Sequence, residues 1–237
     1  MLVMPPYTPP VPKTDIVVDL VREGAIVAFL LESVHTDEVK HGYPACGEAG
    51  RNLSYAVLGR TDIPLTLLIE HPQIAKLLGI PDLSHIAVMN VSQRPLQQSA
   101  YLDNSLTLPR NMKTLEGVKR ALEKKPINDL DAKIKFTPPA QERAQKNLYK
   151  DFCNRFHPHR DRFKLVIPCG HIAYYFMSWY LEKNPDPPFA ILKGLGHPAK
   201  TGKPWIRKGL ADRNLEMLRK LVNLESVGEL VRSLGND

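Results

Sequence analysis

The feature that most constrains the fold is an apolar run that ends in a polar, glycine-containing loop and continues into a helix. The run spans residues 25–31, is rich in aliphatic side chains and is too short to cross a membrane. The helical pattern occupies residues 48–58. Open α/β sheets bind ligands where the carboxyl end of a strand meets the amino end of the next helix. The stretch therefore predicts a buried strand whose loop forms one wall of a ligand site.

Three further apolar runs, at residues 84–91, 163–169 and 189–192, alternate with helical patterns along the chain. The helical patterns lie at residues 15–23, 48–58, 64–78, 114–125, 139–156, 171–181 and 209–234. Strands that alternate with helices in this way are typical of a parallel sheet covered on both faces. We therefore expect an α/β fold, a three-layer sandwich around a central, mostly parallel four-stranded sheet.

A single domain is expected over residues 1–237, because a chain of this length buries one sizeable core. Prolines crowd residues 1–13, which predicts an extended N-terminal arm. Residues 97–162 are polar and basic and carry no core pattern of their own. They predict a helical insertion at one edge of the same domain.

The net charge and the cysteine content indicate which binding partners and which cellular compartment to expect. The formal net charge of +7 admits nucleic acid or another polyanion as partner, although a solvated basic surface accounts for it equally well. Three scattered cysteines without a CxxC pair indicate neither a disulfide framework nor a zinc site. The N-terminus lacks the layout of a signal peptide. We expect a cytoplasmic monomer that does not associate with a membrane.

Polar side chains near the ends of three predicted strands are the candidate functional residues. In the first loop they are Glu32, Ser33, His35 and Glu38. Asn90 offers an amide donor and a carbonyl acceptor, which suit the edge of a nucleobase. His197, in a Gly-His-Pro-Ala turn, can donate to negative charge that develops on a carbonyl. Purely structural alternatives stay open, since Asn90 can cap a strand end and His197 can be an exposed turn residue.

Four short motifs, in this order, resemble those of the uracil-DNA glycosylase superfamily, most closely the families whose first motif reads Gly-Glu-Ala-Pro-Gly. The segment LESVHTDEVKHGYPACGEAG falls on that motif and its continuation, and places Glu32 and Glu38 at acidic positions. Its glycine-proline framework corresponds to Gly42, Pro44, Gly47, Ala49 and Gly50. The second motif is similar to IAVMNVSQRP, which contains Asn90. The third motif is similar to LVIPCGHIA, and the last is similar to His-Pro-Ala at residues 197–199. The resemblance covers residues 24–200.

The resemblance implies a hydrolase that cleaves the N-glycosidic bond of a flipped, deaminated base such as uracil, in the base excision repair of DNA. The catalytic residues would be Glu32, His35, Glu38 and His197, and the base-binding residues would be Asn90, Tyr43 and Ser33. The basic stretch Lys200, Lys203, Arg207 and Lys208 would hold phosphates of single- or double-stranded DNA. Trp205 or Leu195 would press into the duplex.

Departures from the family pattern leave alternatives open. Ser33 stands where better-known relatives have a catalytic aspartate, so His35 or Glu38 would have to replace it. Ala45 stands where the family has a phenylalanine that stacks on uracil, and Tyr43 would have to supply the ring.

Three cysteines cannot hold the four-cysteine iron–sulfur cluster found in this branch, so we expect no cluster, metal or other cofactor. The alternatives are a nucleic-acid-binding member without catalysis and an enzyme that acts on a small nucleoside.

Overall fold

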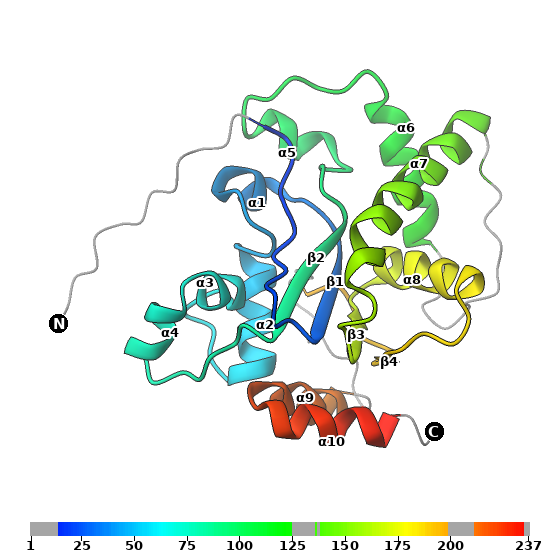
Figure 1. Ribbon diagram of the computed structural model, residues 1–237. Helices are drawn as coiled ribbons and strands as arrows, with labels where there is room; N and C mark the ends of the chain where they lie inside the picture. The colour runs from blue at the N-terminus through cyan, green and yellow to red at the C-terminus, as the bar shows by residue number, and fades with distance from the viewer. Residues whose placement is uncertain (1–13, 125–135, 137, 199–210, 235–237) are drawn as a thin grey trace.

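A four-stranded parallel sheet forms the centre of the computed structural model, which describes residues 14–124, 136, 138–198 and 211–234 (Figure 1). The strands are β1 (Val27–Ser33), β2 (Ile86–Ser92), β3 (Leu165–Pro168) and β4 (Ala190–Ile191), in the order β2-β1-β3-β4. Leu31 pairs with Asn90 and Ser33 with Ser92, so β1 and β2 end at the same edge of the sheet. The α/β fold with a parallel central sheet is thus confirmed.

Helices cover both faces of this sheet. The α-helices of the described residues are α1 (Thr36–His41), α2 (Glu48–Leu58), α3 (Leu65–Glu70), α4 (Pro72–Leu77), α5 (Gln98–Leu102), α6 (Met112–Glu123), α7 (Pro139–Phe156), α8 (His171–Lys183), α9 (Ala211–Arg219) and α10 (Leu224–Leu234). Side chains of β1 alternate between two cores. Phe29 and Leu31 pack with α2, α3, α4, α9 and α10, whereas Ala28 and Leu30 pack with α6, α7 and α8. Figure 1 shows α6, α7 and α8 gathered on one side of the sheet and α2, α3 and α4 on the other.

The segment before β1 departs from the sequence prediction. The helix predicted over residues 15–23 is wrong, because Leu20 forms an antiparallel bridge with Val88 of β2, through two hydrogen bonds of 2.9 Å. Val17 is 1% exposed and Val18 is 67% exposed, which is the alternation of an extended chain. The segment covers the outer edge of β2, whose backbone groups would otherwise lack partners. This tertiary pairing overrides the weak local preference for a helix.

Several predicted boundaries change in ways that affect the site. β1 starts and ends two residues later than the predicted strand, so Glu32 and Ser33 belong to the strand. The short helices α1 and α5 were not predicted. Within residues 97–162 the chain forms α5, α6 and α7, and the apolar side chains of α6 and α7 join the core of β1 and β2. The predicted arm at residues 1–13 lies outside the described residues, as does most of the loop predicted at residues 126–138.

No helix within the described ranges is long and apolar enough to cross a membrane.

Candidate functional site

A pocket of about 280 Å³ lies where β1 and β2 end. Its walls include five of the residues singled out from the sequence, namely Ser33, His35, Glu38, Asn90 and His197. Ser33 comes from β1, His35 and Glu38 from the start of α1, Asn90 from β2, and His197 from the segment that follows β4. Gly47, Glu48 and Ala49, at the amino end of α2, complete part of the wall. The edge of the sheet thus brings together side chains that are far apart in the sequence.

Glu38 connects three parts of this pocket by hydrogen bonds. Its Oε2 accepts from the backbone N–H of His35 at 2.7 Å, because Glu38 is the third residue of α1 and turns back over the helix start. Its Oε1 accepts from the backbone N–H of Ala45 at 2.6 Å and from Nδ2 of Asn90 at 3.1 Å. Burial raises the pKa of Glu38 to about 7, against the opposing effect of these three donors. This carboxyl group therefore titrates near neutral pH.

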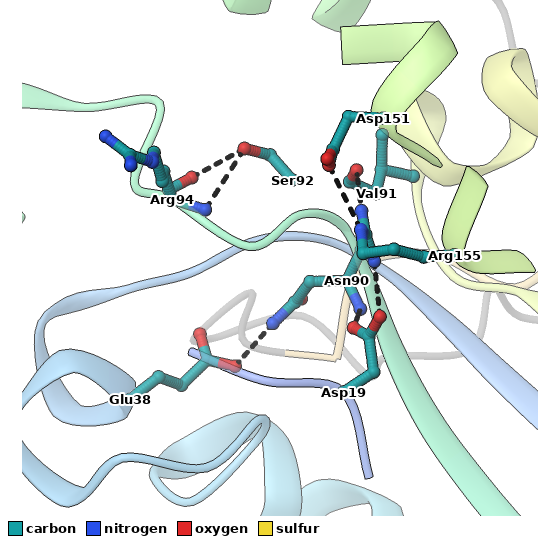
Figure 2. Close-up of polar contacts among 8 residues, drawn as sticks. All are labelled: Asp19, Glu38, Asn90, Val91, Ser92, Arg94, Asp151 and Arg155. Carbon is teal, nitrogen blue, oxygen red and sulfur yellow. Dashed lines mark hydrogen bonds and ion pairs between the residues drawn. The ribbon is translucent and has the colours of Figure 1, made fainter. Parts of the chain in front are cut away.

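Asn90 is held in one orientation by contacts to its side chain and its backbone (Figure 2). Nδ2 donates to Glu38, while its backbone N–H donates to Asp19 and its carbonyl accepts from Arg155, both at 3.0 Å. Arg155 also forms an ion pair with Asp19 and donates to the carbonyl of Val91 at 2.7 Å. The side-chain oxygen Oδ1 of Asn90 is buried and accepts no hydrogen bond from any described residue. Asn90 therefore holds an unused acceptor at the pocket.

Glu32 lies behind the pocket and is not part of its wall. It is 6% exposed, and Lys119 of α6 places its Nζ 3.0 Å from Oε1 of Glu32. Burial on its own raises the pKa of Glu32, but the charges of Lys119 and His197 outweigh it and the pKa falls below its usual value. Glu32 is therefore an ionised partner of Lys119 and is not among the residues that line the pocket.

A chain of hydrogen bonds links Lys119 to His35. Lys119 Nζ donates to Oε1 of Gln97 at 2.8 Å, and Nε2 of Gln97 lies 2.8 Å from Nδ1 of His35. Burial lowers the pKa of His35 to about 4, and electrostatic repulsion from His197 and Lys119 acts in the same direction. Sequence reasoning missed Gln97 and Lys119, because no local pattern marks a residue that reaches a site by packing from another element.

His197 is held beside the start of α8. The backbone N–H of Gly170 donates to the carbonyl of Leu195 at 3.0 Å, and the side chain of Asn52 donates to the carbonyl of Pro198. Gly170 has φ +92°, and a Cβ at this position would lie 3.1 Å from Cβ of His197. Glycine thus allows the close approach that brings the His197 ring to within 5.6 Å of the His35 ring, measured between centroids. Leu195 is 1% exposed, so the prediction that it presses into a duplex is wrong for this arrangement.

The base-binding role predicted for Tyr43 finds no support in the position of its ring. Ala45 lines the pocket, but Tyr43 does not, and its ring centroid lies 6.5 Å from that of His41. The backbone of Ala45 packs directly against α2 at Gly50. A Cβ at Gly50 would lie 1.7 Å from the carbonyl oxygen of Ala45, so this contact needs glycine. Among the described residues that line the pocket there is no Phe, Tyr or Trp.

The described ranges contain no group of three or more His, Cys, Asp or Glu side chains arranged to hold a metal ion. Cys46 and Cys169 are buried thiols whose pKa burial raises, and Cys153 is half-buried. The predicted DNA-binding residues Lys200, Lys203, Arg207 and Lys208 lie outside the described residues, as does Trp205.

No protein-family model matches the chain, and no curated protein matches it in sequence. A functional assignment therefore depends on the geometry and chemistry of the pocket.

Proposed function

We propose that this protein is a DNA glycosylase of the uracil-DNA glycosylase type, which hydrolyses the N-glycosidic bond of a flipped, deaminated base. The observation that carries the proposal is that Asn90 and His197, more than a hundred positions apart, line one pocket in which Oδ1 of Asn90 has no described hydrogen-bond donor. The volume of about 280 Å³ lies at the small end of ligand pockets, which suits one nucleobase. An enzyme that acts on a base must first take it out of the helical stack.

Base selection would follow from the fixed orientation of Asn90. Nδ2 donates one of its two hydrogens to Glu38, which fixes the amide, and Oδ1 is the buried side-chain atom with no described hydrogen-bond partner, so we assign Oδ1 to the base. Uracil, hypoxanthine and xanthine present a ring N–H on their Watson–Crick edge, whereas cytosine and adenine present a bare ring nitrogen there. A buried acceptor that faces a lone pair stays unsatisfied, at a cost of about 1–3 kcal/mol. Asn90 would thus favour uracil over cytosine and hypoxanthine over adenine by roughly 10- to 100-fold, whereas this contact would not separate them from thymine or guanine, which carry the same ring N–H.

The chemistry would be shared between the two sides of the pocket. His35 and His197 lie together where negative charge would develop on the departing base. Ser33 is 1% exposed, and its Oγ has no hydrogen-bond partner in the described structure, so it would position the attacking water. Glu38 would accept the proton of that water, since a carboxylate accepts about four hydrogen bonds and Glu38 receives three. Its pKa of about 7 suits a general base at neutral pH.

The test is base release from oligonucleotides that contain uracil, hypoxanthine or xanthine, with cytosine and free deoxyuridine as comparison substrates. We expect release from at least one deaminated base in DNA, and a loss of about 100-fold or more in Asn90→Ala and His197→Ala. Asn147→Ala, which changes an exposed asparagine on α7, should act like the wild type. If no oligonucleotide loses a base, or if all three variants match the wild type, the proposal is refuted.

A second candidate is a nucleic-acid-binding protein of the same fold that does not cleave. It is favoured by the absence of Phe, Tyr and Trp among the described pocket residues, because stacking of a base on such a ring contributes about 1–3 kcal/mol. Steeply salt-dependent DNA binding without base release would select this candidate. Turnover of free deoxyuridine without turnover of DNA would instead select a nucleoside-acting enzyme.

A further inference from the structure

The hydrogen bonds behind His35 fix which of its ring nitrogens carries the proton. Lys119 has hydrogens to donate and no lone pair to accept with, so the group of Gln97 that faces it at 2.8 Å must be the amide oxygen. The NH₂ group of Gln97 then faces Nδ1 of His35. An NH₂ group only donates in this geometry, so Nδ1 must accept. In a neutral imidazole the proton then resides on Nε2.

We propose that Lys119 and Gln97 are positioning residues that hold His35 as the neutral tautomer with its proton on Nε2, so that His35 donates a hydrogen bond into the pocket. His35 lines the pocket, and its buried Nε2 makes no hydrogen bond to any described residue. The role of this donor in catalysis depends on the proposed glycosylase function, in which it would bind a carbonyl oxygen of the departing base.

The charges around the chain agree with a neutral ring. Burial and the neighbouring His197 and Lys119 lower the pKa of His35 to about 4, so the ring is uncharged at neutral pH. Glu32 pairs with Lys119 at 3.0 Å and offsets its charge. Lys119 orients the side-chain amide of Gln97, and this uncharged amide in turn orients the ring of His35. The arrangement therefore places the ring proton of His35 on Nε2, which has no described hydrogen-bond partner and can donate to a ligand.

The tautomer is measured directly by ¹⁵N NMR of the histidine rings, with His35 assigned from the signal that disappears in His35→Gln. In the wild type we expect Nε2 to be protonated and Nδ1 to be bare. Gln97→Glu replaces the NH₂ group by an oxygen of similar size, so Nδ1 should become protonated. Lys119→Met removes the cation that orients the amide, so signals of both tautomers should appear. A protonated Nδ1 in the wild type, or an unchanged ring in Gln97→Glu, would overturn the proposal.

Gln98→Glu is the matched control, because it makes the same chemical change at the next residue, whose side chain is exposed. It should leave the His35 tautomer and base release unchanged. Gln97→Glu should lower the kcat of base release by about 100-fold, as the loss of one donor to developing negative charge does. A reversed tautomer with unchanged kcat would refute the positioning role. Absence of base release in the wild type would refute the proposed function, while the NMR result would still decide the tautomer.

Discussion

The buried carboxyl group of Glu38 makes the stability of this fold depend on pH. It is 5% exposed, and burial raises its pKa from 4.5 to about 7. Between these two pH values the folded protein holds a proton that the unfolded chain releases. Stability therefore falls as the pH rises through this window, and levels off above a pH of about 7. Below about 4.5 the group contributes no slope, because both states are protonated.

A pKa that rises from 4.5 to about 7 corresponds to about 3 kcal/mol of unfolding free energy lost across the window. Glu38→Gln has no group that titrates at this position, so its stability should lack that part of the slope. The free energy of unfolding of the variant, relative to wild type, should therefore rise by about 3 kcal/mol from acid to neutral pH.

The assay is urea unfolding of wild type and Glu38→Gln at a series of pH values from about 4 to about 8, with the slope against pH compared at constant ionic strength. Glu48→Gln is the control, since Glu48 also lines the pocket but lies at the start of α2. It should keep the slope of the wild type. If wild type and Glu38→Gln lose stability in parallel as the pH rises, the assignment of this titration to Glu38 is wrong.

Two further changes test how the pocket is supported. Gly170→Ala places a Cβ 3.1 Å from Cβ of His197, at a φ of +92° that is strained for alanine. We expect the free energy of unfolding in urea to fall by about 1–3 kcal/mol and base release to slow. Unchanged stability and unchanged release would show that this close approach is not needed. Arg155→Met leaves the buried carboxylate of Asp19 without its ion-pair partner, which should cost about 3–5 kcal/mol, and adding Asp19→Asn should recover part of the loss. Equal effects of Arg155→Met and the exposed Arg143→Met would contradict the importance of this ion pair.

The sequence predicted the fold well where local pattern and tertiary packing agree. The helix predicted at residues 139–156 has the same bounds as α7, because Pro139 fits the first turn of a helix and the apolar residues that follow repeat at helical spacing. Residues 15–23 also carry helical spacing, yet they form an extended edge, because pairing with β2 satisfies backbone groups that a helix there would leave exposed. Local pattern carries no information about such an open edge.

The site was predictable to the extent that it depends on strand ends. Ser33 and Asn90 come from neighbouring parallel strands that end at one edge, so the sheet alone brings them together. Glu32 was assigned to the loop, but β1 continues through it and places it against Lys119 behind the pocket. Gln97 approaches from the start of α5, and its contact with His35 is a consequence of helix packing that spacing along the chain does not encode.

The most direct test of the proposed function is whether an extruded, deaminated base enters this pocket. We suggest an NMR titration with a single-stranded oligonucleotide that carries 2′-fluoro-deoxyuridine, whose sugar resists cleavage of the glycosidic bond. We expect the side-chain amide of Asn90 and the ring signals of His35 and His197 to shift on binding, and the same oligonucleotide with cytosine to leave them in place. Shifts confined to residues outside the pocket, or equal shifts with cytosine, would contradict it.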